Sequence, residues 1–425
     1  MEFNLSSRAR LIPIIMMVIG LVGIIYGYID LDVDSHGHGH DRFWANLLIN
    51  GLFFTFICLG ALFFLALQYA TEAAWSMMVR RIYEAVLAFL PVGIVVLGIV
   101  FLMGTLHQHH IYHWMDEAVQ HEFVMSDSMD SDHPVYADTE VEGAVLNTKY
   151  DHIIAGKSAY LNSGFFWLRT LIYFATFLFF AWWFRKQSLR EDAEGGIAIH
   201  IKSYKRAAIF LVCFAVFSST LAWDWIMSID THWFSTMFGW YTFSGMWVSA
   251  MIVSMILILY LKSKDLMPSV NSSHIHDMGK WMFAISFLWT YLWFSQFMLI
   301  WYSDIPEEVT YFIPRFETYS IAWFTMVGIN FVMPMLMLMS RDAKRNVKFL
   351  ITIGTIIFFG HWFDIYLMVI PGVVFDGWHG LEISEIAMMI GFLGAFIYLT
   401  LSRLASAKLV PENSPMLEES VQHHI

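Results

Sequence analysis

Ten apolar segments, separated by polar stretches, limit most strongly how this chain can fold. A helix needs about 20 apolar residues to cross roughly 30 Å of hydrocarbon. The segments that reach this length are residues 11–29, 44–69, 82–105, 164–186, 206–226, 234–261, 279–301, 319–340, 347–370 and 383–403. Because hydrocarbon offers the backbone no hydrogen-bond partner, only helices and closed barrels span a membrane. The sequence therefore predicts an all-α integral membrane protein with ten transmembrane helices.

The distribution of basic residues tests this topology independently. An even number of spans puts both termini on one side, and cytoplasmic loops carry an excess of Lys and Arg. Of the 24 Lys and Arg residues, 19 fall in the terminal segments and in the loops on their side. The exceptions are Arg169, inside a span, and Arg42, Lys149, Lys157 and Arg315. Both termini are therefore predicted to be cytoplasmic.

The chain reads as one membrane domain. Charged residues make up 14% of it, against about 25% in soluble domains, and no feature predicts nucleic-acid binding. The predicted parts are a ten-span domain at 1–403, its outer hydrophilic loop at 106–163, its cytoplasmic loop at 187–205, and a polar cytoplasmic tail at 404–425. Inside the spans, Pro91 and Pro334 are expected to kink their helices, because proline leaves a backbone carbonyl without its partner.

The outer loop carries much of the net charge of −12, with ten Asp or Glu against two Lys over residues 106–163. Such a face repels anionic partners and attracts a basic one, for example a cationic electron carrier. The alternative is a solvated acidic loop without a partner. The loop is expected to begin with a surface helix from His110 to Val124.

Cysteine and histidine usage predicts no redox centre in this chain. Cys58 and Cys213 lie in the middle of two different spans, where they build neither an iron–sulfur cluster nor a haem-attachment motif. Of the 18 histidines, His361 is clearly inside a span, whereas a bis-histidine haem needs two facing imidazoles. The alternating histidines of residues 36–40 could capture a divalent metal, although a flexible polar loop is the alternative interpretation.

Ionisable groups inside spans are costly and are the candidates for chemistry. His361 and Asp364 stand three residues apart, on one helix face, so that they can share a proton; Tyr366 follows them. Arg169 and Asp224 lie near the outer ends of two other spans. These side chains are all expected in the outer half of the bilayer.

The polar pair Ser295 and Gln296 is expected at the same depth. One interpretation pairs Arg169 with Asp224 or Asp364 as a static buried ion pair that fixes helix register. The other makes the layer a proton relay or the wall of a polar pocket open to the outer face, because histidine titrates near neutral pH.

On the cytoplasmic side the candidate is Glu84, which follows Arg80 and Arg81 just inside the third span. It could begin a cytoplasmic half-channel for protons. The alternative is a side chain that snorkels to the membrane surface.

Four stretches carry a family resemblance. Residues 157–169 (KSAYLNSGFFWLR) resemble the start of a span in the polysulfide-reductase-type integral membrane subunits. Three others resemble more specifically one of the two such membrane subunits of alternative complex III, the bacterial quinol:cytochrome c oxidoreductase. They are DWIMSIDTHWFSTMFG at 224–239, FSQFMLIWYSDIPEE at 294–308 and HWFDIY at 361–366.

The resemblance implies two four-helix bundles, spans 2–5 and 6–9, with spans 1 and 10 peripheral, in a bacterial cytoplasmic (inner) membrane. It implies haem-c subunits, an iron–sulfur subunit and a related membrane subunit as partners, which hold the haem c and the iron–sulfur clusters. The related subunit holds the family's quinol site, whereas the kind that this chain resembles is proposed to conduct protons. Carried over, that path involves Arg169, Asp224, His361 and Asp364.

The predicted function is accordingly that of a cofactor-free membrane subunit of this complex, contributing a proton pathway and structural support. One alternative is a subunit that binds quinol or quinone itself. Another is a stand-alone secondary transporter, although the ionisable layer is shallow for a transporter, whose site lies near the midplane. A purely structural scaffold is the third.

Overall fold

The computed structural model describes residues 3–29, 39–126, 135–137 and 143–424. The described residues are 77% helical, and ten of the helices among them are long and apolar enough to cross a membrane. The predicted all-α multi-pass membrane fold is confirmed. Eight spans are single helices: α1 (Ser7–Ile29), α2 (Gly39–Ala70), α7 (Ser163–Glu194), α8 (Ile197–Trp225), α9 (Met237–Lys262), α10 (Ser272–Ser303), α15 (Val347–Val369) and α16 (Ile383–Leu404).

The third and eighth spans change helix type close to their prolines. The third consists of η2 (Ala74–Val79), α3 (Arg80–Val86), η3 (Leu87–Phe89) and α4 (Leu90–Thr105). The eighth consists of α13 (Ser320–Val327), the π-helical η6 (Gly328–Val332) and α14 (Met333–Met337). Since Pro91 and Pro334 each lack an N–H, the preceding turn is 3-10 in one span and π in the other.

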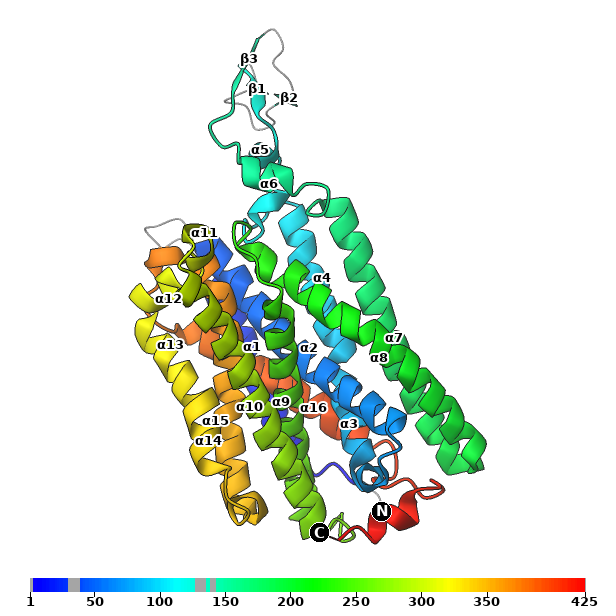
Figure 1. Ribbon diagram of the computed structural model, residues 1–425. Helices are drawn as coiled ribbons and strands as arrows, with labels where there is room; N and C mark the ends of the chain where they lie inside the picture. The colour runs from blue at the N-terminus through cyan, green and yellow to red at the C-terminus, as the bar shows by residue number, and fades with distance from the viewer. Residues whose placement is uncertain (1–2, 30–38, 127–134, 138–142, 425) are drawn as a thin grey trace.

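Helices α2 and α9 lie in the centre of the molecule and pack on each other (Figure 1). Helix α2 also packs against α4, α8, α15 and α16, and α9 against α8, α10 and α15. In their apolar windows 89% of α2 and 72% of α9 is buried, as expected for helices without a polar face. The division of the inner eight spans into two four-helix bundles stays a prediction.

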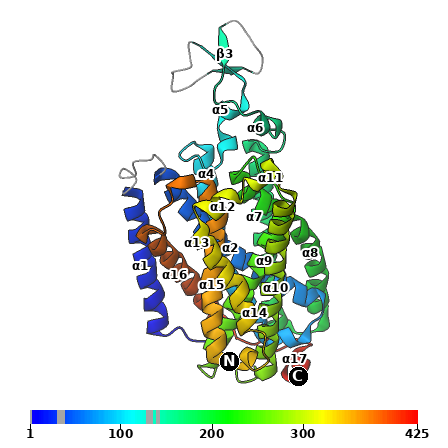
Figure 2. The ribbon, with the colours of Figure 1, turned by 60° about the vertical axis from the view of Figure 1, so that its left-hand side comes forward.

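Helix α1 lies at the edge of the molecule, against α16 (Figure 2). Only 17% of its apolar window is buried. Gly20 and Gly391 meet at the crossing, where a Cβ on Gly20 would lie 2.3 Å from the Gly391 Cα. Small residues allow this close backbone approach, which supports helix association in lipid.

Both termini lie at one end of the helices (Figure 1). At this end the predicted cytoplasmic loop 187–205 is largely helical, because α7 continues to Glu194 and α8 starts at Ile197. Gly195 and Gly196 make the turn with φ of 66° and 91°, a conformation that glycine adopts without strain. The extra turns of α7 are held by ion pairs to the third span, which polar composition alone does not reveal.

The outer loop projects from the opposite end (Figure 1). The predicted surface helix His110–Val124 is wrong: the segment forms η4 (His113–Met115), α5 (Glu117–Gln120) and the start of strand β1 (Phe123–Met125). This segment is instead attached to the C-terminal end of α8, because Tyr112 donates a hydrogen bond to the Trp225 carbonyl at 2.7 Å. Strand β1 pairs antiparallel with β2 (Tyr136–Ala137) and β3 (Ala144–Leu146), and α6 (His152–Gly156) leads back to the membrane.

The remaining elements are short. They are η5 (Met227–Ile229), α11 (Pro306–Val309), α12 (Ile313–Glu317), η7 (Ala343–Arg345), η8 (Ile370–Gly372), η9 (Phe375–Gly377) and α17 (Leu417–Val421). In the polar tail, α17 packs against η2, where Ser420 donates a hydrogen bond to the Trp75 carbonyl at 2.9 Å. The tail thus folds back under the helices.

Candidate functional site

Arg169 and Asp224 form a closed ion pair between α7 and α8. Two guanidinium nitrogens of Arg169 each lie 2.9 Å from a different carboxylate oxygen of Asp224, which is 0% exposed. Tyr173 donates a third hydrogen bond to this carboxylate at 3.0 Å. The rings of Tyr160 and Phe165 cover the guanidinium, at 3.9 and 4.2 Å. This geometry matches the interpretation of Arg169 as a member of a static buried ion pair, and Asp224 rather than Asp364 is its partner.

Asp364 lies about 25 Å along α15 from its first residue, at 1.5 Å per residue, and has a different environment. Its carboxylate accepts hydrogen bonds from the Tyr241 hydroxyl and from Trp289 Nε1, the latter at 3.0 Å, and is 2% exposed. Among the described residues, no Lys or Arg side chain forms an ion pair with it. The nearest basic group is His361 Nδ1, at 3.9 Å.

His361 is as buried as Asp364, and neither ring nitrogen has a hydrogen-bond partner within the described chain. Its ring meets the Trp289 ring edge to face, 5.3 Å between centroids. A cavity lined by His361, Asp364, Thr242 and Ser249 leaves ≈ 10 Å³ for the centre of a water molecule. That is about the space that one water needs.

The other predicted members of the layer lie elsewhere. Gln296 lies on α10 nearly two turns beyond Trp289; it is buried, and its Oε1 has no partner in the described part of the chain. Ser295 beside it is half-buried. Tyr366 turns away from Asp364 and donates a hydrogen bond to Glu385 of α16 at 3.0 Å. The single polar layer expected from depth is therefore divided into separate clusters.

Tyr366 belongs to a cluster that depth reasoning missed. Glu385, fully buried, also accepts hydrogen bonds from Arg42 at 3.1 Å and Asn46 at 2.8 Å. Both charged residues carried a signal in the sequence. Arg42 is one of few basic residues on the outer side, and Glu385 lies inside the tenth apolar segment.

Glu84 is buried rather than snorkelling. Its carboxylate lies 3.0 Å from Arg81, 2.7 Å from Arg185 and 3.7 Å from Arg80. Arg80 is in turn 2.7 Å from Glu191 of α7. The snorkelling interpretation is therefore wrong. The arginines of α3 and α7 point into the protein, where they form ion pairs with Glu84 and Glu191.

Arg315 is a further buried cation, on the side of Asp364 that is farther from the termini. It donates hydrogen bonds to the carbonyls of Leu367 and Met368 at 3.2 and 3.3 Å, at the C-terminal end of α15, where positive charge is favoured. Its guanidinium lies 3.4 Å from the Tyr311 ring centroid. Burial raises the pKa of nearby Asp230, although the charge of Arg315 acts in the opposite direction.

The two cysteines and the alternating histidines complete the candidates. Cys58 is a buried thiol that donates to the Val86 carbonyl at 3.2 Å, and Cys213 is half-buried. Of the alternating histidines, His36 and His38 lie outside the described residues. A scan of the chain against protein-family models and a search of curated proteins found no match.

Proposed function

We propose that this chain is a cofactor-free membrane subunit of a respiratory quinol:cytochrome c oxidoreductase of the alternative complex III type, and that Asp364 with His361 handles protons in it. Both termini are cytoplasmic in this proposal, and the bacterial cytoplasmic membrane is its location. The family assignment is supported by the motifs at 224–239, 294–308 and 361–366. The redox groups belong to the neighbouring subunits.

The observation that carries the proton-handling proposal is the environment of Asp364. Its hydrogen-bond donors are the neutral groups of Tyr241 and Trp289, and its basic neighbour is His361 at 3.9 Å. A carboxylate without a permanent cation is able to take up a proton at membrane depth, because protonation removes a costly buried charge. The imidazole, with both nitrogens unbonded in the described chain, is suited to exchange that proton through one water.

The alternatives fit this site less well. The cavity beside Asp364, ≈ 10 Å³ for water centres, is far smaller than the several hundred Å³ typical of small-molecule pockets. A quinone ring or a transported solute does not fit there without a rearrangement. A proton, carried by one water, does.

The first experiment tests membership. The tagged chain is purified in mild detergent from its own membranes, and the fractions are examined for haem absorption and for iron. We expect this chain to co-migrate with haem-c and iron–sulfur subunits. A colourless, monodisperse single chain would contradict the assignment to the complex.

The second experiment tests Asp364. The intact complex is reconstituted in liposomes with Asp364→Asn, and protons released per electron are measured during quinol oxidation. Asp304→Asn, a matched change at an exposed outer residue, is the control. We expect fewer protons per electron, or slower turnover, only in Asp364→Asn. If the assembled Asp364→Asn complex releases as many protons per electron as the wild type and turns over at the same rate, Asp364 has a structural role only.

A further inference from the structure

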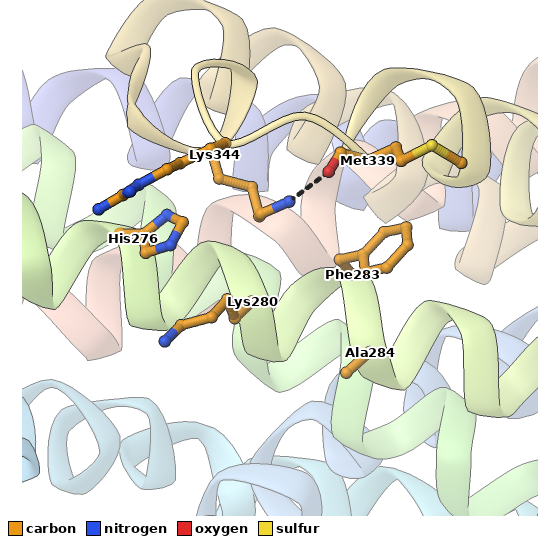
Figure 3. A pocket seen from close by; sticks show the side chains of 7 residues that line it. His276, Lys280, Phe283, Ala284, Met339 and Lys344 are labelled. Atoms are coloured by element: carbon orange, nitrogen blue, oxygen red, sulfur yellow. Dashed lines mark hydrogen bonds between the residues drawn. The ribbon is translucent and has the colours of Figure 1, made fainter. Parts of the chain in front are cut away.

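An open pocket of ≈ 550 Å³ lies at the end of the molecule that carries the termini. Its walls are the first turns of α10 and the segment that links α14 to η7 (Figure 3). The side chains that line it are His276, Lys280, Phe283, Ala284, Met339, Arg341 and Lys344. None of these seven is acidic. The pocket is remote in sequence from the Asp364 site, and its role is independent of the proposed function.

The basic groups lie toward one end of the pocket, on both of its walls (Figure 3). Lys344 is 7% exposed, and its ammonium donates to the carbonyls of Leu338 and Met339 at 2.8 Å each (Figure 3). Burial, and then the charge of Lys280, lower the pKa of Lys344, which indicates that the two cations are near each other. Arg341 is exposed at the rim. An anion in the pocket would relieve this repulsion.

The acidic residue that follows His276 on α10 is already bound. Asp277 lies 2.5 Å from Lys280 and 2.6 Å from His423 of the tail. The positive charge of Arg341 and Lys344 therefore has no carboxylate partner within the pocket lining.

His276 adds an uncommitted polar atom. The residue is 7% exposed, and its Nδ1 has no hydrogen-bond partner in the described part of the chain. Figure 3 shows its ring on the α10 wall, across from Lys344. Buried polar atoms are normally bonded, so this nitrogen points to a ligand oxygen that the isolated chain does not supply.

The other side of the pocket is apolar and continues along the membrane. Lys344 Nζ lies 5.2 Å from the Phe283 ring centroid. One turn further on α10, Phe287 is 51% exposed, and on α14 Leu336 is 70% exposed. Residues four apart share a helix face, so an apolar path leads from Phe283 toward the bilayer interior. The site thus has basic side chains at one end and an apolar surface, from Phe283 to Phe287, at the other.

We propose that this pocket binds an anionic phospholipid, with its phosphate between Lys280, Arg341 and His276 and its acyl chains along Phe283 and Phe287. Basic pockets between transmembrane helices on the cytoplasmic side bind such headgroups. The predicted excess of basic residues puts this end of the molecule on that side. A zwitterionic lipid would bring its own cation into an already positive site.

The test compares lipid binding by the purified full chain, wild type and Lys280→Gln/Arg341→Gln. A photoreactive phosphatidylglycerol in mild detergent is titrated with phosphatidylcholine or with inorganic phosphate as competitor. We expect the double variant to bind this lipid roughly 10- to 30-fold more weakly, because each basic group near the surface contributes about fivefold. Labelling is expected on the peptides that contain Phe283 and Met339.

The control variant is Lys264→Gln/Lys348→Gln, which removes two exposed charges at the same end of the molecule, and it is expected to bind like the wild type. The proposal is overturned if phosphatidylcholine competes as well as unlabelled phosphatidylglycerol, or if millimolar phosphate alone displaces the lipid. It is equally overturned if the wild-type chain is labelled outside the peptides that contain Phe283 and Met339. This result does not depend on whether the variants fold.

Discussion

Asp224 and Asp364 are two fully buried aspartates in the same helical body, and their surroundings differ in charge. Asp224 receives two hydrogen bonds from one guanidinium, that of Arg169. Asp364 receives its hydrogen bonds from a phenol and an indole. The first carboxylate has a permanent counter-ion, and the second has none among the described residues.

This difference separates a carboxylate that holds two helices together from one that can exchange a proton. A buried bidentate pair keeps both partners charged, because removing either leaves the other alone in a medium of low dielectric. A carboxylate with neutral donors stays buried at lower cost when it carries a proton. Asp224 is therefore suited to fix α7 against α8, and Asp364 to take up and release a proton.

The largest expected effect comes from breaking the pair at Asp224. Arg169→Leu leaves that carboxylate buried and unpaired, which costs about 3–5 kcal/mol. We expect a strong loss of thermal stability of the detergent-solubilised chain. Arg169→Leu/Asp224→Leu removes both charges and is expected to recover most of it. A single variant as stable as the wild type would show that the pair contributes nothing.

Changing each aspartate to asparagine is expected to have unequal effects on stability. Asp224→Asn removes the charge that Arg169 needs and is expected to cost about 2–4 kcal/mol. Asp364→Asn keeps an acceptor for Tyr241 or Trp289 and loses one neutral hydrogen bond, at about 1 kcal/mol. Chemical unfolding of the two variants in mixed micelles measures the difference. Equal losses would mean that both carboxylates are held in the same way.

A smaller effect is expected at Gly360, where spans 8 and 9 touch beside His361. A Cβ there would lie 2.2 Å from Asn330 Oδ1 and 2.4 Å from Ile329. Gly360→Ala forces the π-helical turn away from α15, at about 1–2 kcal/mol. Stability and proton release are expected to fall together. Gly98→Ala, where a Cβ meets no atom within 4 Å, is the neutral control.

The smallest effect concerns a carboxylate in contact with water. Desolvation raises the pKa of Asp151, but hydrogen bonds from the N–H groups of Ile154 and Ile153 and from His232 outweigh it and leave the pKa lowered. A lowered pKa stabilises the fold above the ordinary value of 3.8, and this contribution disappears as the pH falls through the lower, folded value.

Asp151→Asn keeps the helix cap and removes the charge. Its stability deficit against the wild type is expected to be at most about 1 kcal/mol at pH 6, because the pair is partly exposed. Thermal melts over a pH series should show the two proteins converging as the pH falls below the ordinary value of 3.8. A deficit that grows on acidification would contradict the sign of this shift.

The fold was predictable because its main constraint is local. Each span needs only length and apolar composition, and the loop charges orient it. The prediction failed where tertiary contacts decide local structure. Residues 187–205 are predicted as a connecting loop, yet α7 continues through Glu191, which forms an ion pair with Arg80 at 2.7 Å. The segment after His110 read as a helix, yet Tyr112 is pinned to Trp225.

The sequence predicted which residues belong to the candidate site, but not which of them contact each other. The spacing of His361 and Asp364 put them on one face, as observed. Depth alone could not tell which aspartate meets Arg169, because that depends on how the helices pack. Glu385 lies within the tenth apolar segment, and a carboxylate in a span is itself a signal; its partners Arg42 and Tyr366 follow only from the packing of α16.

The most direct test of proton exchange at Asp364 is infrared spectroscopy of the intact complex over a pH titration in H₂O and D₂O. A buried carboxyl group that exchanges its proton gives a titrating carbonyl band that shifts in D₂O. We expect such a band in the wild type and in Asp304→Asn, and its loss in Asp364→Asn. A band unchanged in Asp364→Asn would contradict proton exchange at this residue, and so would a titrating band assigned to Asp224.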